Sequence, residues 1–201
     1  MAKEGQSAGL DAIAGEVRRA GKKGPPPVHL WNPPFCGDID MRIATDGTWY
    51  YLKTPIGRPA LVKLFASVLK REDDKYFLVT PVEKVGIVVE DAPFLAVEMN
   101  TEETPDGPAL NFRTNVDDWV RCDGAHPLRF EPEAGTGGLK PYLFIRRDLW
   151  AKVTRPLFYE LVDRGEEREV DGETMFGVAS AGVFFAMARA DSLADSLKDL
   201  T

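Results

Sequence analysis

The feature that most constrains the fold of this chain is a pair of helix starts that share the dipeptide Arg-Pro. The first lies in "IGRPALVKLFASVL", residues 56–69, and the second lies in "LWAKVTRPLFYELV", residues 149–162. Proline suits the first turn of a helix, where its missing N–H costs nothing and its φ angle is already set. Apolar residues follow both prolines at helical spacing, so each stretch predicts one amphipathic helix.

The two helix starts belong to a longer order of strands, helix, charged turn and strands that occurs twice. Three pairs of landmarks keep nearly constant separations of 101, 99 and 97 residues, namely Trp49 and Trp150, Phe77 and Phe176, and Arg58 and Arg155. This spacing indicates a duplicated unit rather than a solenoid, whose periods are much shorter. Chance similarity between two strand-helix-strand segments is the alternative. The sequence thus predicts an α+β fold with two related β-rich subdomains, each with a hairpin-flanked helix.

Strand-like runs surround both predicted helices. Residues 40–52, "DMRIATDGTWYYL", contain two strand-like runs, one on each side of Asp46-Gly47. This dipeptide readily takes the positive φ angles of a hairpin turn. Charged turns are predicted after the helices, at "KREDDK" (70–75) and "DRGEEREVDGE" (163–173), and a loop is predicted at "TEETPDGPA" (101–109). Further strands are predicted at "YFLVT", "VGIVVE", "FLAVEM", "LNFRT", "WVRC", "PLRF", "YLFIRR", "TMFGVAS" and "VFFAMA".

These patterns predict four segments. Residues 1–27 form an N-terminal helical and Pro-rich appendage, in which Leu10, Ile13, Ala14 and Val17 follow helical spacing before "GPPP" ends the helix. We expect this helix to dock on the body, although a basic membrane-surface helix is the alternative. An N-terminal α+β subdomain over 28–93, a C-terminal subdomain over 94–188 and a tail or short helix over 189–201 follow.

Composition excludes several classes of protein. The net charge is −7, and eleven carboxylates but three arginines lie between Glu90 and Glu133. Nucleic-acid binding is not expected, because phosphate backbones need clustered Lys and Arg. No apolar run is long enough for a membrane span or resembles a signal peptide, and the two cysteines do not form a disulfide framework. We therefore expect a cytoplasmic protein that does not bind membranes.

The arginines at the helix starts are the first candidate site residues. Arg58 and Arg155 place a positive charge at the positive end of a helix, which is unfavourable unless an anion lies there as well. Free backbone N–H groups, the helix dipole and a guanidinium together suit a phosphate or a carboxylate. The alternative is that each arginine reaches solvent or pairs with a carboxylate of the chain, for instance Glu160 or Asp163.

Two loops add further candidates. In "VTPVEKVGI", Thr80 and Lys84 could offer a hydroxyl and an ammonium to an anion, although a plain charged hairpin tip is the alternative. In "RTNVDDWV", Asn115 lies beside two aspartates, but the spacing lacks the glycine and the distal glutamate of a calcium loop. We predict a turn there whose Asn and Asp side chains bond to nearby backbone.

No pattern identifies a reaction or a cofactor. A zinc site would need His29, Cys36, Cys122 and His126 to converge, and their spacing resembles no common finger, so no metal is expected. Motifs for a nucleophile elbow, a Walker A loop, a dinucleotide fold and a zinc protease are absent from the sequence. Enzyme activity is left open, and the sequence leans against it.

Several of these stretches resemble a bacterial family, domain-of-unknown-function family 1285. The resemblance rests on "HLWNPPFCGDIDMRIATDGTWYY", "PIGRPALVKLFASVLKRE", "YFLVTPVEKVGIVVEDAPF", "FRTNVDD", "HPLRF" and "PYLFIRRDLWAKVTRPLFYELV", and extends over about residues 28–188. It implies a duplicated core with a pleckstrin-homology-like C-terminal half, and a pocket between the halves for a nucleotide-like ligand in signalling. It implies no established activity and no agreed binding residues.

The leading hypothesis is a cytoplasmic signalling protein that binds a small anionic, nucleotide-like ligand between its two subdomains. A protein-interaction adaptor, which binds a partner peptide at an exposed strand edge, is the alternative. The candidate ligand-binding residues are Arg58, Thr80, Lys84, Asn115, Arg147, Arg155 and Tyr159.

Overall fold

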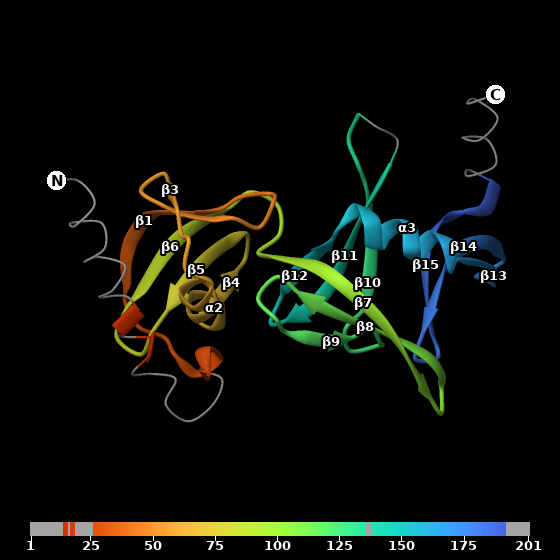
Figure 1. Cartoon of the computed structure of the whole chain (residues 1–201), viewed down its shortest axis with the longest axis horizontal. Helices are drawn as coiled ribbons and strands as arrows, with labels where there is room; N and C mark the ends of the chain where they lie inside the picture. Colours follow the sequence, from red (N-terminus) through yellow and green to blue (C-terminus); the bar gives the residue numbers. More distant parts are fainter. Residues whose placement is uncertain (1–13, 16, 19–25, 136–137, 192–201) are drawn as a thin grey trace. The chain divides into compact units, whose positions relative to one another are not determined.

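The computed structural model describes residues 14–15, 17–18, 26–135 and 138–191 (Figure 1). Contacts between residues divide the chain into two compact units, Met1–Pro93 and Phe94–Thr201. We call them the N-terminal unit and the C-terminal unit, and describe each by itself.

A six-stranded sheet, the N-terminal sheet, forms the body of the N-terminal unit. Only β1 and β6 pair in parallel, and the other neighbours pair antiparallel. The order across the sheet is β3 (Thr54–Pro55), β2 (Trp49–Tyr51), β1 (Phe35–Ile43), β6 (Lys84–Val89), β5 (Lys75–Val79) and β4 (Leu69–Glu72). A short 3-10 helix, η1 (Val28–Leu30), precedes β1.

Helix α2 (Pro59–Ser67) supplies the other half of this core. Its residues Leu61 and Phe65 are buried, and the Phe65 ring stacks on the Trp49 ring of β2 with centroids 6.3 Å apart. Burying such aromatic pairs stabilises a fold by the apolar area removed from water and by a further contribution from ring geometry. The core of the unit therefore lies between α2 and one face of the N-terminal sheet.

A second six-stranded sheet, the C-terminal sheet, is curled into a half-barrel (Figure 1). Here β12 and β7 form the parallel pair, and the other neighbours pair antiparallel. The order across the sheet is β10 (Leu128–Pro132), β11 (Leu139–Arg146), β12 (Leu149–Val153), β7 (Phe94–Thr104), β8 (Gly107–Thr114) and β9 (Trp119–Arg121).

A helix and a small sheet complete the C-terminal unit. Helix α3 (Arg155–Asp163) lies against β7 and β14 and buries Leu157 and Leu161. The small sheet consists of the antiparallel strands β13 (Glu166–Val170), β14 (Glu173–Ser180) and β15 (Val183–Arg189), and it contacts the C-terminal sheet through the pairs β14–β8 and β15–β10.

The core is duplicated, as the sequence predicted. Each unit has a six-stranded sheet with one parallel strand pair, and in each a strand that contains a landmark tryptophan precedes the helix. Proline lies in the first turn of both helices, at position 59 in α2 and at position 156 in α3. The α+β class is confirmed, and strands dominate it.

Both helices are shorter than predicted. Helix α2 begins after Arg58 and ends at Ser67, and β4 begins at Leu69, inside the range predicted as helix. Residues Leu149–Val153 form strand β12 rather than the first turns of a helix. Alternate residues of β12, namely Leu149, Ala151 and Val153, are buried, which is the period of a strand. This period-two pattern is visible in the sequence, and the prediction of a helix over these residues was wrong.

The predicted charged turns and the predicted loop contain strands. Lys70–Glu72 belong to β4, Glu166–Val170 form β13, and most of the stretch 101–109 continues β7 and β8 into a long hairpin. Every residue of β13 is exposed, so the strand shows no alternation of polar and apolar residues. Backbone pairing with β14 holds it, and charged side chains suit such an edge strand.

The first residues of the chain are described in part. Residues 14, 15, 17 and 18 are helical, and Ala14 and Val17 are fully buried. Leu10 and Ile13, the other members of the predicted apolar stripe, lie outside the described residues, as does the predicted C-terminal tail beyond residue 191. In the described part of the chain, no helix is long and apolar enough to cross a membrane.

A buried hydroxyl links the small sheet to the end of strand β9. Ser180 is fully buried, accepts a hydrogen bond from Leu110 N at 2.8 Å and donates one to Cys122 O at 2.6 Å. Leu110 and Cys122 face each other at the end of the β8–β9 ladder, where Cys122 N donates to Leu110 O at 2.8 Å. The hydroxyl therefore replaces the second bond that an antiparallel pair would make directly.

Ser180→Ala should destabilise the protein by roughly 2 kcal/mol, because it leaves a buried N–H and a buried C=O without partners. Urea unfolding measures this loss of free energy. The control is Ser67→Ala, whose hydroxyl donates to Leu64 O at the end of α2 and whose loss should cost under about 0.5 kcal/mol. A neutral Ser180→Ala would mean that Leu110 and Cys122 bond directly once the hydroxyl is gone.

Candidate functional site

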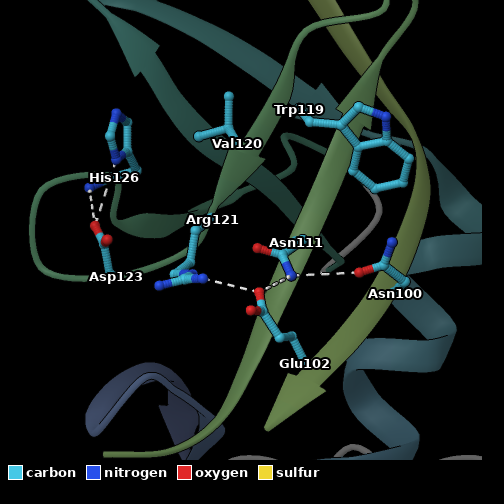
Figure 2. Close-up of a pocket in the computed structure, with 8 residues that line it drawn as sticks. All are labelled: Asn100, Glu102, Asn111, Trp119, Val120, Arg121, Asp123 and His126. Carbon is cyan, nitrogen blue, oxygen red and sulfur yellow. Dashed lines mark hydrogen bonds and ion pairs between the residues drawn. The ribbon is translucent and has the colours of Figure 1, made fainter. Parts of the chain in front are cut away.

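A polar pocket lies on strands β7, β8 and β9 and on the loop that follows β9 (Figure 2). It is open to solvent and has a volume of about 670 Å³. Its walls combine two carboxamides, an ion pair, an indole and an imidazole. The lining residues are Asn100, Glu102, Asn111, Trp119, Val120, Arg121, Asp123 and His126.

Strand alternation places Asn100, Asn111 and Arg121 on one face of the sheet. In β8, Leu110 and Phe112 are buried, so Asn111 between them points to the opposite face. The register pairs Asn111 with Asn100 on β7 and with Arg121 on β9, and residues directly opposite share a face. A row of three polar side chains therefore crosses the outer face of the sheet.

Hydrogen bonds connect this row. Asn111 Nδ2 donates to Asn100 Oδ1 at 3.3 Å and to Glu102 Oε2 at 3.2 Å, and Arg121 donates to Glu102 Oε2 at 2.8 Å (Figure 2). The bond from Arg121, followed by the bond from Asn111, holds the pKa of Glu102 below its ordinary value. Glu102 is therefore ionised at neutral pH and orients both neighbours.

Two polar atoms of the row have no partner among the described residues. Asn111 uses its amide nitrogen, which leaves its Oδ1 as an acceptor, and Asn100 uses its oxygen, which leaves its Nδ2 as a donor. The neighbouring carboxamides thus offer one acceptor and one donor from the same face.

Trp119 forms the apolar wall of the pocket. Its side chain is 48% exposed, and the register places it opposite Arg113 on β8. Arg113 is held by Glu98 at 2.6 Å and by Asp117 at 2.7 Å, so its guanidinium is engaged beside the indole. A large aromatic side chain that stays half exposed at the wall of a pocket is suited to stacking on a planar ligand.

The loop after β9 closes the opposite wall. Backbone N–H groups of Ala125 and His126 donate to Asp123 Oδ1 at 2.8 and 2.9 Å. Burial alone would raise the pKa of Asp123, but these bonds outweigh it and lower the pKa. His126 Nδ1 lies 3.4 Å from Asp123 Oδ1, within ion-pair distance but without the alignment of a hydrogen bond. His126 belongs to this loop, and the next strand, β10, begins at Leu128.

In the N-terminal unit, the three candidates from the sequence have structural contacts of their own. Arg58 is the N-cap residue of α2. Thr80 is buried, and its hydroxyl accepts hydrogen bonds from Val82 N and Glu83 N within the turn after β5. Lys84 binds Glu72 at 2.8 Å and lies over the Phe77 ring.

In the C-terminal unit, two of the four candidates bind other parts of the chain. Asn115 N donates to Leu95 O at 2.9 Å, and Asn115 Oδ1 accepts from Leu95 N at 3.0 Å. This bond reaches β7 rather than the nearby backbone that the sequence predicted. Arg155 binds Glu133 at 2.8 Å, so a carboxylate of the chain lies beside the second helix start.

The other two candidates are exposed. Arg147 lies in the turn between β11 and β12 with a φ of +46°, and Tyr159 is 60% exposed on α3 and stacks on Phe158. The polar pocket is lined by none of the seven candidates. Its residues were missed because Trp119 and Asn111 were assigned only to strands; the alternation in "LNFRT" was the available signal.

No metal site is found in the part of the chain that the structure describes. There, no group of three or more His, Cys, Asp or Glu side chains is arranged to hold an ion. His29 and Cys36 are exposed, whereas Cys122 is buried, and burial raises the pKa of its thiol to about 12.

Asn115→Ala should lower the free energy of unfolding by about 1–2 kcal/mol, because Leu95 N loses its acceptor in a half-buried position. Asn100→Ala is the control, since Asn100 is exposed and should change stability by less than about 0.5 kcal/mol. Urea titration of both variants gives the comparison. Equal stabilities would show that the Asn115 side chain contributes no folding energy.

The carboxylate of Glu72 should make the stability of the protein depend on pH in the acidic range. Lys84, followed by Lys70, donates to Glu72 and lowers its pKa. A lowered pKa in the folded state adds stability above the ordinary value of about 4.3, and this stability is lost as the pH falls through the lowered pKa. Between pH 6 and pH 3, the wild type should therefore lose more thermal stability than Glu72→Gln. Parallel losses would contradict the role of this ion pair.

Two family profiles match the chain. "Domain of unknown function (DUF1285), N-terminal domain" matches residues 26–92, and "Protein of unknown function (DUF1285), C-terminal domain" matches residues 93–187. A search of curated proteins finds no match.

Two solved structures are similar to the chain. The crystal structure of a DUF1285 family protein from Silicibacter pomeroyi DSS-3 is 47% identical, with a TM-score of 0.81, and the match covers 90% of this chain and 97% of that chain. A DUF1285 family protein from Shewanella baltica OS155 is 34% identical, with a TM-score of 0.49, and the match covers 61% of this chain and 89% of that chain. The two profiles together extend over residues 26–187, and the chain belongs to the DUF1285 family.

Proposed function

We propose that this protein is a ligand-binding protein with a cytoplasmic signalling role, and that its C-terminal unit holds the base of a nucleotide-like small molecule. The observation that carries the proposal is the half-exposed Trp119 at the wall of the polar pocket. The same pocket contains a donor, Asn100 Nδ2, and an acceptor, Asn111 Oδ1, that have no partner among the described residues. A planar base offers the two features that these groups complement, an aromatic face and a polar edge.

The indole supports stacking of a base. Trp119 is held in place by β9, whose central residue Val120 pairs with Phe112 of β8. A rigid strand reduces the entropy that an aromatic side chain loses when a ligand stacks on it. Stacking of a base on an aromatic side chain contributes about 1–3 kcal/mol and tolerates any base.

The carboxamides support a choice among bases. Asn111 Oδ1 can accept from an exocyclic amine, and Asn100 Nδ2 can donate to a ring nitrogen. Adenine and cytosine carry such a donor beside an acceptor, whereas the corresponding edges of uracil and hypoxanthine carry a carbonyl in place of the amine. The proposal therefore favours adenine or cytosine.

Charge indicates which part of the ligand occupies the pocket. Glu102 and Asp123 are carboxylates with lowered pKa values, and Arg121 supplies the single guanidinium. The two carboxylates and the guanidinium together have a formal charge of −1, which opposes a phosphate inside the pocket. A nucleotide would thus seat its base here and keep its phosphate outside.

Trp119→Ala should weaken binding of adenosine by roughly 5- to 150-fold, because it removes the stacking surface. Isothermal calorimetry with adenosine, cytidine, uridine and adenosine 5′-monophosphate gives the affinities. The matched control is Phe35→Ala, which removes a 54% exposed aromatic side chain from the N-terminal unit. Absence of binding by the wild type, or equal binding by Trp119→Ala, would overturn the proposal.

Variants of the two arginines at the helix starts test, in the same experiment, the anion site that the sequence predicts there. If a phosphate-bearing ligand binds at these arginines, Arg58→Ala and Arg155→Ala should weaken the binding of adenosine 5′-monophosphate but not the binding of adenosine. Arg155→Ala also removes the ion pair with Glu133, so the thermal stability of this variant is measured alongside. Binding of the monophosphate at wild-type strength by both variants would leave the pocket on β7–β9 as the candidate site.

A further inference from the structure

Strand β9 has an open outer edge. It is the last strand of the C-terminal sheet, and β8 is its neighbour on the inner side. Thr114 N donates to Asp118 O at 2.9 Å, and Cys122 N donates to Leu110 O at 2.8 Å, so residues 118 and 122 bond towards β8. In an antiparallel pair every second residue bonds to the neighbouring strand, which assigns Val120 to the same direction.

The residues between them point the other way. Trp119 and Arg121 therefore direct their backbone N–H and C=O groups away from β8, towards the open edge. Among the described residues, no strand pairs with this edge and no side chain bonds to these groups. Both residues are exposed, so four backbone groups are available to a further strand.

Strand β9 lacks two common protections of an edge strand, a charged side chain that projects over the edge and a proline. A charged side chain that projects over an edge hinders another strand, but the Arg121 guanidinium is held on the sheet face by Glu102 at 2.8 Å. β9 contains no proline, and Trp119 offers an exposed apolar contact beside the edge. The strand has only three residues, which limits a partner to a short paired segment.

Charge selects the kind of segment. Five carboxylates but three guanidinium groups surround β9, and these eight groups together have a formal charge of −2. A second copy of β9 would bring the same charges and repel, whereas a basic segment is attracted. The carboxylates are Glu98, Glu102, Asp117, Asp118 and Asp123, and the arginines are Arg113, Arg121 and Arg146.

We propose that the open edge of β9 binds a short, extended, basic segment of a partner protein as an added strand. Backbone bonds to Trp119 and Arg121 hold the segment, and its lysine or arginine side chains meet the surrounding carboxylates. This inference goes beyond the nucleotide-like ligand, because it uses the strand edge rather than the carboxamides of the pocket. If the protein is a protein-interaction adaptor, the alternative function, the open edge of β9 is the surface that binds its partner.

The test compares two substitutions of one residue. Arg121→Pro removes an outward N–H but no bond to β8, and proline is tolerated at such an edge position. Arg121→Ala also removes the side chain but keeps the N–H. A fluorescein-labelled heptapeptide of alternating lysine and threonine is the probe, and fluorescence anisotropy measures its binding to the full chain. We expect Arg121→Ala to bind at least as tightly as wild type, and Arg121→Pro to lose about tenfold or more in affinity.

Probe variants keep the inference testable if Arg121→Pro does not fold. A heptapeptide with the same charges, but N-methylated at alternate residues, should bind wild type at least about tenfold more weakly, because it lacks the donors of an added strand. Equal binding of the methylated probe, or of a probe with glutamate in place of lysine, would overturn the inference. A dimer of the free protein that Arg121→Pro abolishes would instead assign the edge to a second copy. Adenosine binding by the wild type is measured under the same conditions and tests the nucleotide-like ligand independently of the heptapeptide, so the two proposals can fail separately.

Discussion

The buried hydroxyl of Ser180 is the contact on which the candidate surfaces of the C-terminal unit depend. It lies between Leu110 N and Cys122 O and joins the small sheet to the end of the β8–β9 ladder. A buried polar group is costly unless it is bonded, so this arrangement favours one position for the strand end. Strand β9 ends at Arg121 because the hydroxyl takes the next position in the ladder.

The position of β9 has two consequences, one for its side chains and one for its backbone. Because side chains alternate across a strand, Trp119 and Arg121 both lie on the polar face, next to Asn111 of β8. Because hydrogen bonds alternate as well, the same two residues direct their backbone towards the open edge. A ligand on the face and a strand at the edge would therefore meet the same two residues, and each would affect the binding of the other.

Much of the fold could be predicted from local patterns. Proline after arginine marks both helix starts, and a hairpin turn lies at Asp46-Gly47, where Gly47 has a φ of +79° but Asp46 does not take a positive φ. Errors arose where a local pattern was ambiguous or absent. The sequence predicts a turn at the charged residues of β13, because an edge strand that is exposed on both faces carries no hydrophobic period.

Side-chain partners were the part that spacing could not supply. The carboxylate beside Arg155 is Glu133, 22 residues earlier in the chain, rather than Glu160 or Asp163 of the same helix. Thr80 completes its own turn, and Asn115 bonds to Leu95 across the sheet. Each of these polar groups satisfies hydrogen bonds of the fold, which is the commonest fate of a buried or half-buried polar side chain.

The sequence by itself determined the duplicated order of elements, the two helix starts and the α+β class, because these depend on residues close together in the chain. Only the tertiary structure decided which polar residues share a face, which strand remains at an edge and which arginines already have carboxylate partners. Strand register decides all three, and register depends on contacts between residues that lie far apart in the chain, such as Ser180 with Leu110.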